Sequence, residues 1–241
     1  GGDGMIQTEG IFVGGSAISA PIIGEDFNWS GGDGTYQVLD DGGGNWRIKF
    51  LSSGTFTPLK NMVIDVFLVG GGGGAGSSYC GEGGAGYTTT VRSIVLAANT
   101  AYPIVVGAAG TNGNPSSAGG ETTAFTASAA GGKNTSNGTS SSKRPGGAGG
   151  SGGAGYVSPV ATTTGGTDGG DGTSSATAGG KGQGTTTREF GEADGDLYAS
   201  GGGSNLSATV ANSGNGGRNG ITSIAPADGI VVIRQHKEVA A

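Results

Sequence analysis

The stretch MVIDVFLVGGGGGAG, residues 62–76, places eight almost continuously apolar residues directly before five consecutive glycines. An apolar, β-branched run of this length is typical of a central strand that is covered on both faces. Asp65 interrupts the run, and we expect its carboxylate to have a partner or to lie at a sheet edge. No segment of the chain repeats apolar residues at helical spacing over three turns. The sequence therefore predicts an all-β fold with almost no α-helix.

Other strands are expected on both sides of this stretch. In WRIKFL (46–51), apolar and basic residues alternate, which is the period-2 pattern of a strand with one wet face. Strong signals also cover 87–96, 101–107 and 229–235, and weaker ones cover 122–127 and 156–163. Because GIVVIRQ (229–235) has the composition of a core strand far downstream of the others, we expect it to return to the same jelly-roll-like β-sandwich. The region between, 107–227, is then an insertion.

The insertion has a composition that hydrophobic burial alone does not fold. Residues 107–227 contain 33 glycines but only nine Leu, Ile, Val or Phe residues, too few to offset the conformational entropy of so much glycine. Within it, GGAGGSGGAG (146–155) repeats GGX three times, which matches the three residues per turn of the polyproline II geometry. Such helices pair their backbone groups only with neighbours or with water. We predict a bundle of polyglycine II helices, with a flexible loop as the alternative; further candidate members are 70–76, 81–86, 165–172, 179–184 and 214–220.

Three regions are expected along the chain. Residues 1–45 form an N-terminal attachment segment, residues 46–235 form the glycine-rich β-sandwich domain, and residues 236–241 form a tail. In the middle of the insertion, the Ser/Thr/Asn-rich residues 127–145 are expected to replace glycine helices with loop.

Composition argues against several classes of function. The net charge is −6 and the 12 basic residues are scattered along the chain, so no nucleic-acid partner is expected. No apolar run approaches the roughly 20 residues of a membrane-spanning helix, so membrane insertion is not expected. Cys80 is the one cysteine and His236 the one histidine, which leaves no disulfide, no cysteine-rich metal site and no histidine-based triad. We therefore expect a protein that is not an enzyme.

Three motifs suggest chemistry that their context does not support. Gly71, Gly73 and Gly76 spell G-x-G-x-x-G after a strand, but the helix that would hold a pyrophosphate does not follow, so no nucleotide cofactor is expected. GGTDGGDGT (165–173) is a single imperfect copy of a calcium-binding nonapeptide repeat. REFGEADGD (188–196) gathers four acids, which are expected to be solvated or paired, with adventitious Ca²⁺ as the alternative.

The order of motifs resembles a known family. WRIKFLSSGTFTPLKNMVIDVFLVGGGGGAG, GGAGYTTT, AYPIVVGAAG, GQGTTTREFGEADGDLYASGGG and ADGIVVIRQ are together similar to the glycine-rich domain family of phage and prophage tail and tail-fibre proteins. The arrangement also looks like the extracellular glycine-rich domains of certain receptor kinases, in which a jelly-roll sandwich carries a polyglycine bundle. The resemblance implies a receptor-binding or structural component of a virion and supplies no catalytic residues.

These observations lead to one expected function and two alternatives. The leading expectation is an adhesin domain on a phage tail or extracellular tail-like particle, which binds a bacterial surface polysaccharide or protein and contacts other tail or baseplate proteins. A purely structural virion domain that decorates or oligomerises is the first alternative, and an ice-binding protein is the second. The expected receptor-binding residues are the polar and aromatic groups among the glycines: Arg188, Phe190, Tyr198, Tyr79 and Tyr156. For Tyr156 and Phe190, the alternative to receptor binding is that the rings pack against the sandwich.

Overall fold

A computed structural model describes residues 26–77, 79–136, 144–156, 163–173, 179–219 and 223–235. The strands are β1 (Phe27–Trp29), β2 (Tyr36–Gly42), β3 (Asn45–Phe50), β4 (Gly54–Pro58), β5 (Met62–Val69), β6 (Thr88–Leu96), β7 (Tyr102–Val105), β8 (Thr122–Ala124), β9 (Ala127–Ala129) and β10 (Ile230–Gln235). One 3₁₀ turn, η1 (Glu189–Gly191), is the helical element among the described residues. The chain is thus all-β, as its patterns predict. No helix in these ranges has the length and apolarity needed to cross a bilayer.

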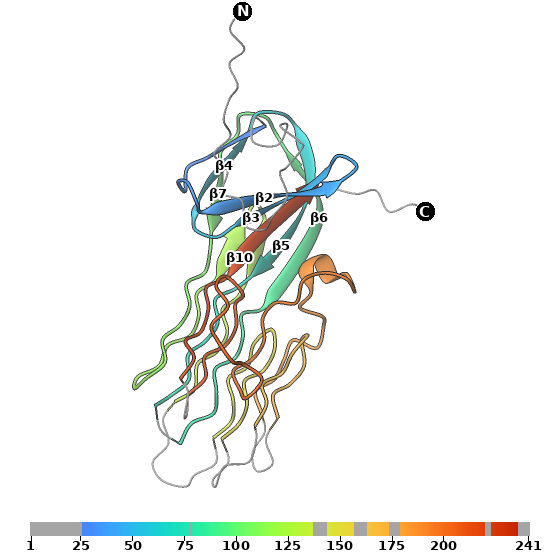
Figure 1. The fold of residues 1–241 in the computed structure, drawn as a ribbon. Coiled ribbons are helices and arrows are strands. Elements are labelled where there is room, and N and C mark those ends of the chain that lie inside the picture. The colour runs from blue at the N-terminus through green and yellow to red at the C-terminus, as the bar shows by residue number, and fades with distance from the viewer. Residues whose placement is uncertain are drawn as a thin grey trace, which may run out of the picture.

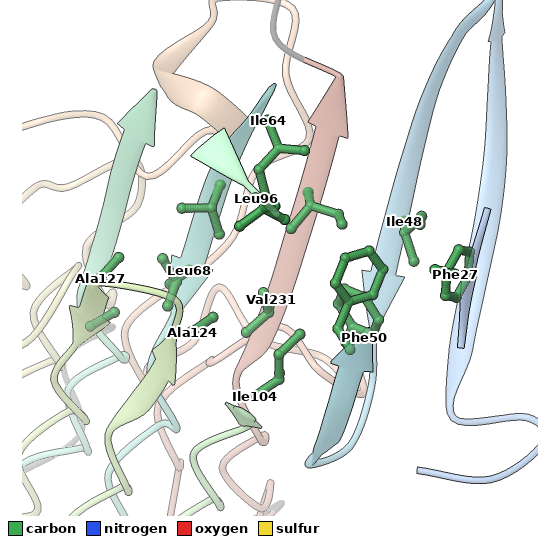
Figure 2. Packing of buried hydrophobic residues seen from close by; sticks show 14 residues of the cluster. Phe27, Ile48, Phe50, Ile64, Leu68, Leu96, Ile104, Ala124, Ala127 and Val231 are labelled. Atoms are coloured by element: carbon green, nitrogen blue, oxygen red, sulfur yellow. The ribbon is translucent and has the colours of Figure 1, made fainter. Parts of the chain in front are cut away.

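The strands form two antiparallel sheets that pack face to face. One sheet has the order β1-β4-β7-β8-β9 and the other the order β2-β3-β10-β5-β6. Their shared core contains Phe56 and Ile104 from the first sheet, and Phe50, Leu68 and Val231 from the second. Figure 2 shows side chains of this core between the strands, among them Phe50, Leu68, Ile104 and Val231. The core is therefore that of a β-sandwich.

The C-terminal strand occupies the position that the sequence predicts. β10 lies between β3 and β5, and Val231 is in register with Phe50 on one side and Leu68 on the other (Figure 1). The chain thus returns to the sandwich after the glycine-rich region. In the part of that region that the structure describes, the regular elements between β7 and β10 are the short strands β8 and β9 and the turn η1, and the glycine segments between β5 and β6 join the same bundle.

The sandwich extends further toward the N-terminus than the expected boundary at residue 46. β1 pairs with β4, and β2 pairs with β3 over Tyr36 to Gly42. Phe27 is buried in the shared core. Short polar turns at 30–35 and 42–44 separate these strands, and they weaken the strand signal in the sequence. Residues 1–25 and 236–241 of the expected attachment segment and tail lie outside the described residues.

The glycine-rich segments continue directly from the strands and form a bundle on one end of the sandwich (Figure 1). Their backbone hydrogen bonds repeat every three residues. The segment 82–87 contacts three neighbouring segments in turn. The N–H groups of Glu82 and Ala85 donate to Ala154 and Ser151 of the first, and those of Gly83 and Gly86 donate to Gly217 and Gly214 of the second. The N–H groups of Gly84 and Tyr87 donate to Lys133 and Ala130 of the third. A β-strand alternates with period two, whereas a polyproline II helix has a period of three. The hydrogen bonds therefore follow the period that the GGX repeat predicts.

Two details of the bundle differ from the sequence-based expectation. The GGX tract 146–155 bends at 149–151, and its two arms pair so that Gly153 N–H donates to the Gly147 carbonyl at 2.9 Å. In the Ser/Thr/Asn-rich middle, residues 127–129 form β9 and residues 130–135 join the bundle through Gly132 and Lys133. In this stretch Ala130 and Lys133, three residues apart, are exposed, whereas Thr135 is buried and bonds the backbone of Gly76 and Gly81. The expected strand at 156–163 lies mostly outside the described residues.

Candidate functional site

The five residues that the sequence singles out fall into two separate groups. Arg188, Phe190 and Tyr198 belong to a loop, residues 187–198, that docks on the outer face of the second sheet. The rings of Tyr79 and Tyr156 contact each other, and the segments that carry them run to the end of the bundle away from the sheets (Figure 1). We call the first group the flank loop. We call the second region, residues 76–77, 79–82, 144–146, 154–156 and 218–219, the distal end.

The flank loop is fastened by its backbone and by two aromatic rings. Glu189 N–H donates to the Asp196 carbonyl at 2.9 Å, and the Thr187 hydroxyl donates to the Tyr198 carbonyl at 2.7 Å. The rings of Phe190 and Tyr198 lie 6.0 and 5.5 Å from the ring of Phe67 on β5. Both are buried, so for Phe190 the structure shows packing against the sandwich. Together they cover the outer face of β5, which is why that strand is apolar on both faces.

Asp65 has the partners that its burial demands. Its carboxylate is fully buried and lies 3.1 Å from Nε of Arg234 and 3.2 Å from Nη1 of Arg92. It also accepts the Ser93 N–H at 3.1 Å, at the point where β6 carries an irregularity in its pairing with β5. Arg234 extends further to Glu192 of the flank loop, with two bonds of 2.7 and 2.8 Å. A buried carboxylate with these partners fixes both the sheet and the loop.

A second ionic cluster joins β3 to the flank loop. Glu189, 2% exposed, contacts Nη1 of Arg47 at 2.5 Å and Nζ of Lys49 at 3.3 Å. Lys49 also lies 2.9 Å from Asp196 and 2.9 Å from the Tyr198 hydroxyl. Burial lowers the pKa of Lys49, but its contacts with Tyr198, Glu189 and Asp196 outweigh burial and hold it above its usual range. Burial raises the pKa of the Tyr198 phenol to about 12. The lysine therefore stays charged and the phenol neutral at any physiological pH.

The acidic residues of the flank loop thus serve docking. The carboxylates of Glu189, Glu192 and Asp196 are each matched by an Arg or Lys of the sandwich. Across the part of the chain that the structure describes, no group of three His, Cys, Asp or Glu side chains is arranged to hold a metal ion. Arg188 stays partly exposed; it lies 3.5 Å from Asp168 and donates to the Gly195 carbonyl at 3.0 Å.

The distal end presents an aromatic pair. The rings of Tyr79 and Tyr156 lie 5.8 Å apart with an interplanar angle of 86°. Tyr79 is 47% exposed, and its backbone has a φ of 49°. An aromatic residue in the left-handed region costs free energy that burial of its ring would normally offset. Tyr79 nevertheless leaves about half of its surface in solvent.

The residues on both sides of Tyr79 are bonded to neighbouring segments. Thr135 accepts the Gly76 N–H at 3.1 Å and donates its hydroxyl to the Gly81 carbonyl at 2.6 Å. The side chain of Asn219 donates to the Gly76 carbonyl. Cys80, next to Tyr79 in the chain, is buried.

The glycines of the G-x-G-x-x-G motif are explained by packing. A Cβ atom at Gly71 would lie 2.1 Å from the Ala108 carbonyl oxygen, and one at Gly73 would lie 2.4 Å from that of Lys133. The aspartates of the 165–173 repeat also have local partners: Asp168 accepts from Thr186 and Thr187, and Asp171 from Lys181. Both motifs therefore have structural roles in the bundle.

Sequence reasoning did not identify the cations that anchor the flank loop. Arg47 and Lys49 alternate with core residues on β3, and Arg234 stands opposite Asp65 on β10. The alternation marks them as outward-facing, but it does not reveal that the face is covered. The partly buried Glu82 of the distal end also has no distinctive sequence signal, because a single acid in a glycine run forms no pattern.

The fold and its two ends define a class of protein: an all-β sandwich that supports a glycine-rich bundle with an exposed aromatic pair at its tip. The chain belongs to the glycine-rich domain family, whose pattern matches residues 51–234. A comparison with curated proteins found no match. The match begins directly after β3 and ends one residue before the end of β10, so it includes β4 to β9, the bundle, the flank loop and nearly all of β10, whereas β1, β2 and β3 precede it.

Proposed function

We propose that this chain is the host-attachment domain of a phage tail or an extracellular tail-like particle, and that it binds a bacterial surface polysaccharide or protein with its distal end. The observation that carries the proposal is the half-exposed Tyr79, paired with Tyr156 and held in a left-handed conformation. Aromatic rings with a polar rim are the usual anchors for sugar faces and for protein hot spots.

The bundle suits this role because it separates support from recognition. Its scaffold is fixed by main-chain hydrogen bonds between glycine segments, so residues at the turns can change without altering the scaffold. The sheets lie at the opposite end (Figure 1), where other tail or baseplate proteins could hold the domain. Assignment to a phage particle rests on the resemblance in motif order, from the strand at residue 46 to the closing strand at 229–235.

The test compares binding of variants to bacterial cells. The fluorescently labelled full chain is incubated with a panel of bacteria and with their purified surface polysaccharides. Replacing both Tyr79 and Tyr156 by Ala should leave the circular dichroism spectrum and melting unchanged. Loss of two aromatic anchors of about 2 kcal/mol each should weaken binding by roughly three orders of magnitude.

Two matched controls locate the surface. Leu197→Ala removes a side chain of the flank loop that is 42% exposed, and Arg188→Ala removes the partly exposed arginine of that loop. Both should bind cells like the wild type. If the tyrosine variant binds normally and Arg188→Ala does not, recognition belongs to the flank loop. A folded wild-type chain that binds no cell or polysaccharide but assembles with tail proteins would support the structural alternative instead.

A further inference from the structure

An arginine stands directly beside the aromatic pair of the distal end. Arg144 is opposite Tyr156 in an isolated antiparallel bridge, and the Tyr156 N–H donates to the Arg144 carbonyl at 2.9 Å. The side chains of two directly opposed residues leave the backbone on the same side. The ring of Tyr156 in turn lies 5.8 Å from that of Tyr79. Because Arg144 is partly exposed, this bridge places a cation next to the two rings at the surface.

A second arginine lies on the neighbouring segment. Arg218 is partly exposed, and its Nη1 donates to the Leu206 carbonyl at 3.0 Å. A carbonyl is neutral, so this bond orients the guanidinium without cancelling its charge. The next residue, Asn219, donates its side-chain amide to the carbonyl of Gly76, at the start of the turn that carries Tyr79. Each arginine thus lies beside a segment that bears one ring of the pair.

The distal end is positive although the chain is acidic. The net charge of the chain is −6, whereas the described residues of the distal end include two arginines and one acid, Glu82. The cations of the sandwich are instead matched by carboxylates. Ion pairs of 3.2 Å or less join an Asp or Glu to each of Arg47, Lys49, Lys60, Arg92 and Arg234. A local excess of positive charge of this kind attracts anionic ligands.

We propose that the distal end binds an anionic polysaccharide of the bacterial surface, with Arg144 and Arg218 pairing with its carboxylate or phosphate groups and Tyr79 and Tyr156 contacting its sugar rings. A guanidinium forms two parallel hydrogen bonds with a carboxylate or a phosphate, and an aromatic face with a polar edge suits a sugar ring. The inference rests on the proposed function and specifies the class of receptor within it.

The composition of the distal end favours a polysaccharide over a protein receptor. Protein interfaces have a core of large apolar side chains. Among the described residues of the distal end, none is Leu, Ile, Val, Phe, Met or Trp, and small residues surround the two tyrosines. A charged polysaccharide presents the same sugar and the same anion at many places along its length. Several copies of the domain on one particle can therefore bind it together, so a small surface suffices for each.

The first measurement uses the full wild-type chain and matched polymers. The probes are two fractions of bacteria that the chain binds: phosphate-rich wall teichoic acid and acidic capsular polysaccharide, the latter also with its carboxylates reduced to neutral alcohols. Binding to one native fraction should fall at least about tenfold when NaCl is raised from about 0.05 to about 0.5 M. If the capsular polysaccharide is the ligand, carboxyl reduction should weaken binding to a similar extent. The fraction that binds identifies the anion.

Three results would overturn the anionic class while leaving host attachment in place. They are equal binding to native and carboxyl-reduced capsule, binding to cells that is insensitive to salt, and binding that protease treatment of the cells abolishes, which would indicate a protein receptor. A folded chain that binds no cell and no polysaccharide would overturn the proposed function together with this inference.

The second measurement assigns the charge to the two arginines. Arg144→Gln and Arg218→Gln each remove charge-assisted hydrogen bonds, so each should weaken binding about tenfold or more at low salt. Lys60→Gln, which neutralises an exposed lysine of the sandwich, is the matched control and should bind like the wild type. Circular dichroism melting checks that each variant is folded. Arginine variants that bind like the wild type, beside a Tyr79 and Tyr156 double alanine variant that does not, contradict the proposal; if the arginine variants do not fold, the wild-type comparison of polymers and salt decides.

Discussion

Replacing Gly153 by Ala tests whether the bundle depends on backbones in direct contact. A Cβ atom at this position would lie 2.1 Å from the Glu82 carbonyl oxygen, so the two segments must separate by about 1 Å to reach ordinary contact. Gly153 N–H bonds the Gly147 carbonyl at 2.9 Å, and the Gly153 carbonyl accepts the Gly180 N–H at 2.8 Å. The displaced Glu82 carbonyl also accepts the Gly147 N–H. Three buried hydrogen bonds are therefore stretched together.

The expected cost is large relative to the stability of a domain. A buried hydrogen-bonding group left unpaired costs about 1–3 kcal/mol, so two or three disrupted bonds give roughly 3–6 kcal/mol. Typical domains have about 5–15 kcal/mol of stability. Equilibrium urea unfolding followed by circular dichroism should show a midpoint lowered by more than about 1 M, or no cooperative transition.

The control is Gly170→Ala in the same bundle. At Gly170 a Cβ atom meets the Thr167 carbonyl oxygen at 3.1 Å and nothing else within 4 Å. Without a severe clash, a Gly to Ala change restricts the unfolded chain and is nearly neutral or slightly stabilising. The contact argument fails if Gly153→Ala unfolds at the wild-type midpoint, or if Gly170→Ala is equally destabilised.

Two further predictions concern the sandwich. A chain that ends at Ala227 lacks β10, which pairs with both β3 and β5. This truncated chain should aggregate, because the loss of β10 exposes two hydrophobic strand edges. A soluble truncated chain that melts cooperatively would contradict this prediction. Arg234→Met leaves the fully buried Asp65 with Arg92 as its remaining cationic partner, so it should lower the free energy of unfolding by about 3–5 kcal/mol. Arg188→Met, which removes the exposed pair with Asp168 and the bond to the Gly195 carbonyl, should change stability by about 1 kcal/mol; equal losses in the two variants would show that burial is not the cause.

Much of the sandwich could be predicted because its signals are local. The alternation in 46–51, the apolar run of 62–69 and the closing strand 229–235 each reflect the two-residue period of a strand. β1 and β2 were assigned to an attachment segment because each is short and bordered by turns rich in Gly and Asp. Their place in the sheets depends on pairing with β4 and β3, which no local pattern specifies.

The candidate site residues were also predictable only in part. Aromatic residues among glycines were recognisable as unusual, and Tyr79 and Tyr156 do meet at the distal end. Phe190 and Tyr198 have the same sequence context, yet their rings are buried against Phe67. The difference arises because the flank loop folds back on the sandwich, whereas the turn at Tyr79 projects from the bundle.

The sequence by itself determined that the fold is all-β, that the C-terminal strand returns to it, and that the glycine-rich region must be organised by hydrogen bonds, since composition and short periods specify these features directly. Only the tertiary structure decided which charges and rings are buried. Asp65 and Arg234 are separated by 169 residues, and Arg47 and Glu189 by 142. The physical reason is that burial and pairing depend on which distant segments the fold brings into contact, and single residues carry no record of their partners.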